Sequence, residues 1–217
     1  MANNFKNSIV RNVSSDETLP HAIYYTPNSK KSIAIELDVA NNTSAGVTVS
    51  VMLEDEASAS TTAITTVTGT NGSTDTVFTA SNHGLETNDR VRFNDGGAGT
   101  APGNIVGGAG PTANGSQGTG KMYYVSKVND NTFKVGETRN PTTFIQCSNS
   151  GTSPVFRKIN TASVIRQAPV PVGSSLKVIS GQKLVVESDS ASLHDKIYIH
   201  ASATGVDAVL SVLEDVS

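Results

Sequence analysis

The chain has 217 residues, enough for one large or two small domains, and 36% of them are hydrophobic while only 5% are aromatic. Serine, threonine, asparagine, glycine and valine dominate over strong helix formers, which indicates a β-rich and loop-rich protein. A formal net charge of -3 and a charged fraction of 16% exclude the basic field that binding to nucleic acid or an anionic membrane would need.

The single cysteine and the distribution of apolar residues further limit the class of protein. Cys147 has no partner for an intrachain disulfide, so the fold is not expected to depend on oxidation. No apolar run approaches the roughly 20 residues that span a bilayer, and the start of the chain has no apolar segment typical of a secretory signal. We therefore expect no membrane partner.

The first block of predicted strands lies between residues 7 and 53. Strands are expected at Asn7–Val13 and Ala22–Tyr25, separated by Leu19-Pro20. Apolar residues then alternate with polar or small ones over Ile33–Val39 and again over Val47–Leu53, which places one apolar face on each strand. The last two strands are predicted to pair as a hairpin.

A second block of strands follows residue 159. Ala162–Gln167 is expected to be a strand, and Ala168–Gly173 to be irregular because its prolines cannot donate to a central ladder. Further strands are expected at 176–179 and 183–187, and a last hairpin joins 197–200 to 208–213. Seven or eight short strands with regular turns predict an antiparallel β-sandwich or jelly roll.

The two blocks also resemble each other. Lys31–Asp55 and Lys196–Asp215 both begin with a lysine before an alternating strand and both end in Leu-Glu-Asp. This similarity suggests duplication or pseudo-symmetry, although strands that end in Leu-Glu-Asp also arise by chance. We predict that residues 1–60 and 159–217 form one discontinuous host domain, interrupted by an inserted domain at 61–158.

The insert has its own β pattern and is predicted to be small and β-barrel-like. A long glycine-rich loop at 94–120 holds ten of the nineteen glycines, and we expect it to be exposed because such a run buries little apolar surface. The expected strands of the insert are 62–68, 76–80, 90–93, 122–128, 132–135 and 143–147.

Residues that could carry chemistry do not form a convincing set. His83 would need converging partners to act as a catalyst or metal ligand, and His83-Gly84-Leu85 with Asp89 is better explained as a turn before a strand. The glycine clusters lack the Gly-Lys-Ser/Thr ending of a phosphate loop. We therefore predict no catalytic residue, no metal ligand and no cofactor.

Two acidic groups and several aromatic residues allow alternatives. Glu54–Glu56 with Asp189 and Asp195 lacks the fixed spacing of a calcium loop, and a solvated strand end is the expected explanation. The aromatic residues Phe93, Tyr123, Tyr124 and Phe133 could stack on sugars, but in so small a domain they are expected to form its core.

Two stretches resemble known proteins of tailed bacteriophages. The insert resembles small β-barrel modules that recur in phage structural proteins, although its glycine loop is longer, and the matching segments are Val77–Leu85, Asp89–Phe93, Tyr123–Val125 and Asn131–Val135. The host resembles small virion proteins of phages of marine or cyanobacterial hosts, through Ala168–Leu176 and Ser211–Asp215.

The resemblance implies a non-enzymatic virion structural protein, assembled in the bacterial cytoplasm, that associates with copies of itself and with other virion proteins. A head-tail connector, collar or tail component is the first expectation. The expected assembly contacts are the mobile N-terminal arm (residues 1–8), which contains Phe5, the adjacent Ile9, and the segment with Pro169 and Pro171.

Alternatives are a capsid decoration or cement protein, a fibre-type protein, or an adhesion module that binds a host-surface glycan through the insert. A glycan hydrolase ranks lowest because no pair of carboxylates stands out.

Overall fold

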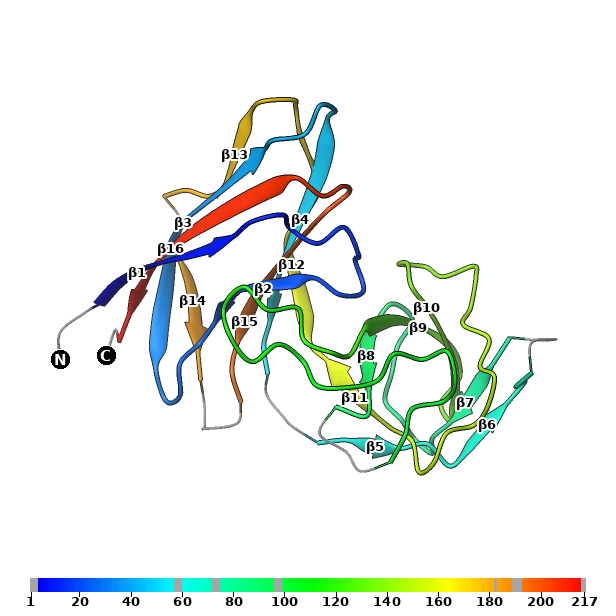
Figure 1. Cartoon of the computed structure of the whole chain (residues 1–217). Coiled ribbons are helices and arrows are strands. Elements are labelled where there is room, and N and C mark those ends of the chain that lie inside the picture. Colours follow the sequence, from blue (N-terminus) through cyan, green and yellow to red (C-terminus); the bar gives the residue numbers. More distant parts are fainter. Residues whose placement is uncertain are drawn as a thin grey trace. The chain divides into compact units, whose positions relative to one another are not determined.

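We describe a computed structural model of the chain over residues 4–56, 60–71, 75–95, 99–181, 183–188 and 193–215. In this part of the chain there is no helix, and the strands form three sheets in which every pairing is antiparallel (Figure 1). The predicted all-β, antiparallel fold class is thus confirmed.

The chain divides into two compact units. The first comprises Met1–Ser58, Pro111–Gln117 and Thr161–Ser217, and the second comprises Ala59–Gly110 and Gly118–Asn160. The expected domain limits were 60/61 and 158/159. The segment Pro111–Gln117, which the sequence analysis assigned to the insert, groups with the first unit.

The first unit is a β-sandwich of two sheets around one core. Valine, isoleucine and leucine side chains from the inner faces of both sheets are fully buried together, as the period-two alternation of the strands predicts. One sheet has the order β1 (Asn4–Val10), β16 (Val206–Glu214), β3 (Lys31–Asn41), with β13 (Ser175–Ile179) and β14 (Leu184–Glu187) both paired to β3. The other has the order β12 (Thr161–Val170), β4 (Val47–Glu54), β15 (Lys196–Ala201), β2 (His21–Tyr25).

The two predicted hairpins of this unit are wrong. β3 pairs with β16, and β4 pairs with β15, so each consecutive pair of strands crosses from one sheet to the other. The two crossing corners meet where the N–H of Asn42 donates to the carbonyl oxygen of Gly205 at 3.0 Å. The alternation of apolar residues shows which face of a strand is buried, but it does not show which strand lies beside it.

Strand limits also differ from expectation at both edges. The first strand is Asn4–Val10, so residues 4–8 belong to a sheet rather than to a free arm, and residues 1–3 lie outside the described residues. β12 continues through Pro169, which is opposite Thr48. A proline is tolerated there because β12 is an edge strand whose unpaired side needs no N–H.

The second unit is a single curled sheet. Its two end strands, β5 (Thr62–Ala63) and β6 (Thr66–Thr68), are separated only by Ile64 and Thr65. The N–H groups of these two residues donate to the carbonyl oxygens of Pro154 and Thr79, which lie toward the two ends of the strand order. No hydrogen-bonded strand pairing closes a barrel in the described residues. The order is β5 (Thr62–Ala63), β11 (Val155–Ile159), β8 (Arg90–Phe93), β9 (Met122–Asn129), β10 (Thr132–Gly136), β7 (Val77–Thr79), β6 (Thr66–Thr68).

Two expectations for the insert are overturned. Residues 143–147 do not form a strand; the buried Cys147 is instead fixed by its N–H, which donates to Thr76 Oγ1 at 2.8 Å. The glycine-rich loop is not exposed throughout, because Ile105 lies in the core of the second unit and Pro111 is buried in the first. Residues 96–98 of this loop lie outside the described part of the chain.

Candidate assembly surface

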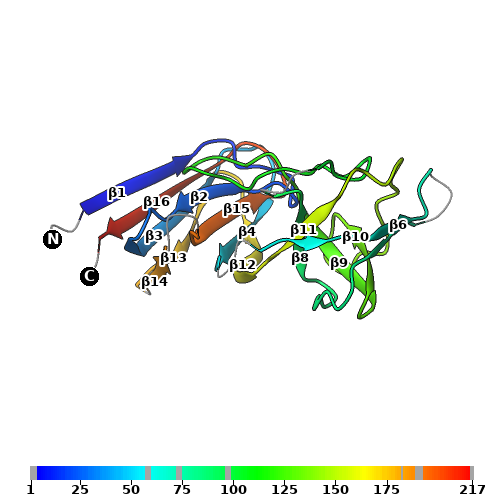
Figure 2. The same cartoon turned by 90° about the horizontal axis from the view of Figure 1, so that it is seen from below.

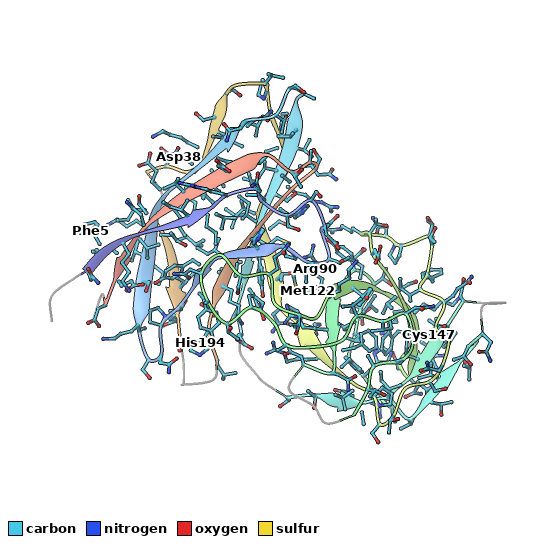
Figure 3. The ribbon with its side chains drawn as sticks, viewed as in Figure 1. Phe5, Asp38, Arg90, Met122, Cys147 and His194 are labelled. Carbon is cyan, nitrogen blue, oxygen red and sulfur yellow. The ribbon has the colours of Figure 1, made fainter. Side chains whose placement is uncertain are left out.

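Strand β1 forms one edge of the first sheet and carries two exposed apolar side chains. Within the described residues β1 pairs only with β16, along a continuous register from Asn4 opposite Glu214 to Val10 opposite Ala208. Phe5 is 73% exposed and Ile9 is 56% exposed. Figure 2 shows β1 at the outer end of its sheet, and Figure 3 shows Phe5 near the start of the strand.

Phe5 ends a row of apolar residues that crosses the outer face of this sheet. The register places Val185 opposite Ile33, Ile33 opposite Leu213 and Leu213 opposite Phe5. Val185 is 53% exposed, and Ile33 and Leu213 are half-buried. A row that crosses four strands and leaves its two end members in solvent is an unusual use of apolar side chains on a sheet face.

The other three edges of the sandwich are protected against strand pairing. The edge opposite β1 is divided between two short strands, β13 and β14. β12 contains two register shifts and Pro169. Short strands, irregular register and proline all discourage the addition of a further strand.

The fourth edge, β2, is covered by the segment Pro111–Gln117 of the same chain. Ala22 exchanges two backbone hydrogen bonds with this segment, from its N–H to Ser116 at 2.8 Å and from the N–H of Gly115 to its carbonyl oxygen at 2.7 Å. The side-chain oxygen of Asn114 accepts a bond from the N–H of Tyr25 at 2.6 Å. β2 is therefore paired, and β1 is the edge that stays long and regular and that has, among the described residues, no backbone partner on its outer side.

This cover over β2 was not predicted from the sequence. The available signal was a local fall in glycine, since residues 111–117 contain one glycine while the rest of 94–120 contains nine. That signal marks a segment able to hold an ordered conformation, but it does not identify β2 as the partner.

The expected assembly residues do not form one surface. Phe5 and Ile9 share one face of β1. Pro169 and Pro171 are also exposed, but Pro169 lies on β12 in the other sheet, and the Pro171 carbonyl accepts bonds from Ser174. The structure thus separates the four predicted contacts into two places on the first unit.

The predicted turn motif of the insert is held by both nitrogens of His83. Its Nδ1 accepts the N–H of Leu85 at 2.9 Å, so we assign the proton to Nε2, which donates to the carbonyl oxygen of Asn129 at 3.0 Å. Gly84 has φ +64°, a conformation that glycine adopts without strain. Asp89 closes the next turn by accepting the N–H of Glu86 at 2.7 Å. His83 is therefore occupied in backbone bonds.

The four aromatic residues considered for sugar stacking are buried. Phe93, Tyr123 and Phe133 are fully buried, and Tyr124 is buried beneath the guanidinium of Arg90, 4.5 Å from the ring centre. The ring of Phe133 contacts Phe78, His83 and Phe156 at centroid distances of 5.2–5.4 Å. These rings have no open face for a sugar.

A buried ion cluster stabilises the same unit. Arg92, which is 1% exposed, and its cross-strand neighbour Arg157 both bind the Oδ2 atom of Asp95, at 3.0 and 2.5 Å. Burial alone would raise the pKa of Asp95, but the two guanidinium groups outweigh it and hold that pKa below its ordinary value. Gly110 lies against Arg92 so closely that a Cβ would come within 2.6 Å of Nη1.

Glu54 was expected at a solvated strand end, but it is buried, with 1% of its surface exposed. Its carboxylate accepts the phenol of Tyr198 at 2.5 Å and lies 3.7 Å from the Lys196 ammonium. The equivalent residue of the second Leu-Glu-Asp, Glu214, accepts the phenol of Tyr24 at 2.9 Å and binds Lys6 at 2.5 Å.

Both Leu-Glu-Asp glutamates thus accept a tyrosine phenol and lie beside a lysine, but the lysines that begin the two blocks are not equivalent, because Lys196 lies beside Glu54 whereas Lys31 binds Glu187. Burial, together with Glu214, raises the pKa of Tyr24 and keeps its phenol a donor. Asp189, part of the acidic set considered in the sequence, lies outside the described residues. In the ranges that the structure describes, no three histidine, cysteine or acidic side chains gather as a metal site would require.

Comparisons with known proteins leave the family open. No protein-family model matches the chain, and a search of curated proteins finds no significant match. Within the described residues no helix is long and apolar enough to cross a membrane.

Proposed function

We propose that this chain is a non-enzymatic structural protein of a tailed-bacteriophage virion, which assembles in several copies at the neck or tail. The observation that carries the proposal is the open β1 edge with exposed Phe5 and Ile9. Edge strands that present apolar side chains associate with other chains unless they are protected, and this fold protects its other edges. Its partners are copies of itself and other virion proteins, and its location is the virion, after assembly in the bacterial cytoplasm.

The alternative functions are compared by the burial of the aromatic side chains and by the use each function would make of the β1 edge. A glycan-binding role for the insert loses support because the aromatic side chains that would stack on sugar rings are buried. A capsid decoration or fibre-type protein would use the same β1 edge, and only its place on the particle would differ.

Self-assembly is tested by the absolute mass of the protein, measured by light scattering after size exclusion. We expect a discrete oligomer. Substituting Phe5→Ser with Ile9→Ser should reduce its mass toward that of the monomer, because both side chains are exposed and their loss leaves the core intact. The matched control is Val106→Ser with Val128→Ser, two exposed apolar residues of the second unit.

A wild-type protein that stays monomeric over a wide range of concentration would overturn self-assembly. An oligomer that is indifferent to the Phe5 and Ile9 substitutions would move assembly to another surface. The place on the particle is then found by immunogold labelling of the encoding phage: label at the neck or tail supports the proposal, whereas label over the capsid faces or along the fibres would favour one of the alternatives.

A further inference from the structure

We propose that two copies of this chain pair through their β1 strands, antiparallel and about a two-fold axis at Asn7. The first sheet of one copy then continues into the first sheet of the other. This inference rests on the proposed self-assembly and specifies its contact.

The backbone of β1 is suited to accept a strand. β1 has seven residues and pairs with β16 without a register shift, so its unpaired N–H and C=O groups form a regular row. The covering segment 111–117 comes close to this row at Ile9. A Cβ placed on Gly115 would meet a single atom within 4 Å, the Ile9 carbonyl oxygen at 3.8 Å, and among the described residues no backbone hydrogen bond joins the segment to β1.

The side chains of β1 select the register. In an antiparallel pair centred on Asn7, Phe5 lies opposite Ile9 of the second copy, and Lys6 lies opposite Ser8. Each exposed apolar side chain of β1 then has an apolar partner, as stable cross-strand pairs require. A register centred on Lys6 would instead place two ammonium groups opposite each other, and would put Phe5 opposite Asn7. The sequence of β1 is therefore complementary to itself in one register.

The pairing also extends the apolar row on the outer face. On the outer face, Phe5 ends the row Val185–Ile33–Leu213–Phe5 of one copy and lies next to Ile9 of the second copy. In that second copy, Ile9 lies opposite Val209 on β16. Val209 is itself 39% exposed. The residues that are difficult to explain on an isolated chain become neighbours in the pair.

Cysteine cross-linking in the full chain tests the register. Asn7→Cys places two cysteines opposite each other with Cα atoms about 4.5–5.5 Å apart, within the about 4.4–6.8 Å that a disulfide requires. Asn4→Cys is the control on the same strand, because its two cysteines would be about 20 Å apart. The wild-type protein is a second control, because it shows whether the native Cys147, which is buried, forms any cross-link by itself.

We expect mild oxidation to convert the Asn7→Cys protein to a covalent dimer, and the Asn4→Cys protein to give about ten-fold less dimer or none. The copy number from light scattering should be even. An oligomer of unchanged mass in which Asn7→Cys fails to cross-link, or one with an odd copy number, would overturn the β1 pair and leave self-assembly standing. A monomeric wild type would overturn both.

Discussion

The residue with the clearest local role is His83, whose imidazole bridges two backbone groups that are far apart in sequence. It accepts the N–H of Leu85, two residues ahead, and donates to the carbonyl oxygen of Asn129, at the end of β9. An imidazole that uses both nitrogens in this way fixes a turn, and it has no free nitrogen for catalysis or metal binding.

Substitutions of His83 should therefore lower the stability of the protein by amounts that depend on which hydrogen bond is kept. His83→Ala loses both hydrogen bonds and the contact with Phe133, and should cost about 2 kcal/mol. His83→Asn keeps an acceptor for the N–H of Leu85, as in an Asx turn, and should cost about half as much. Thermal unfolding of the three proteins measures the order; equal losses for alanine and asparagine would contradict the role assigned to Nδ1.

Asp95 makes the stability of the second unit depend on pH, and the sign of this dependence is predictable. Its pKa is lowered in the folded state, so its contribution to stability is present above its unfolded pKa of about 3.8–3.9 and is lost as the pH falls through the lower folded value. Asp95→Asn leaves Arg92 and Arg157 without their shared carboxylate, and should cost about 3 kcal/mol near neutral pH.

The loss caused by Asp95→Asn should shrink as the pH falls below about 4, when calorimetric unfolding of wild type and variant is compared. Asp75→Asn is the matched control in the same unit, because the Asp75–Lys134 pair is partly exposed and should contribute less than about 1 kcal/mol. A difference between wild type and Asp95→Asn that grows toward acid would reverse the assigned sign.

At the scale of elements, the sequence predicts strands better than it predicts their partners. The alternation of Ile33, Leu37 and Val39 or of Val49 and Val51 follows from burial of one face, and these strands are where they were expected. The crossing of β3 to β4 between sheets depends on contacts between the two corners, which no local pattern encodes. The same limit hid the cover over β2.

The prediction of assembly residues and buried charges from the sequence is limited in the same way. Phe5 and Ile9 were expected as contacts because they lie in or next to the N-terminal arm that was predicted to join neighbouring copies. That they share one regular edge could be known only from the pairing of β1 with β16. The buried Glu54 and Glu214 could not be recognised from sequence, because a carboxylate at a strand end looks solvated until its tyrosine and lysine partners are placed.

At the scale of the whole molecule, the segment Pro111–Gln117 makes the connectivity more complex than an insertion would. The chain passes between the two units after residues 58, 110, 117 and 160, where a simple inserted domain needs two passages. The two additional passages end on a segment that hydrogen bonds join to β2.

Gly115→Pro should release this segment. Gly115 has φ +77° and donates its N–H to Ala22, whereas proline fixes φ near -65° and has no N–H. The amides of Ala22 and Tyr25, which donate to Ser116 and Asn114, should then exchange with solvent at least about ten-fold faster. Gly173→Pro, at another glycine of positive φ, is the control and should leave both amides protected, and protected amides in Gly115→Pro would show that the segment is held by other contacts.

The fourfold passage of the chain has a mechanical consequence. A force that pulls the two units apart would load four covalent connections, and two of them transmit it through the bonds that hold residues 111–117 along β2. Only Asn160 joins β11 to β12, so that connection would carry the force first, and the bonds along β2 would be loaded only after the slack of the glycine-rich loop is taken up. The segment along β2 would thus act as a reserve tether between the two units.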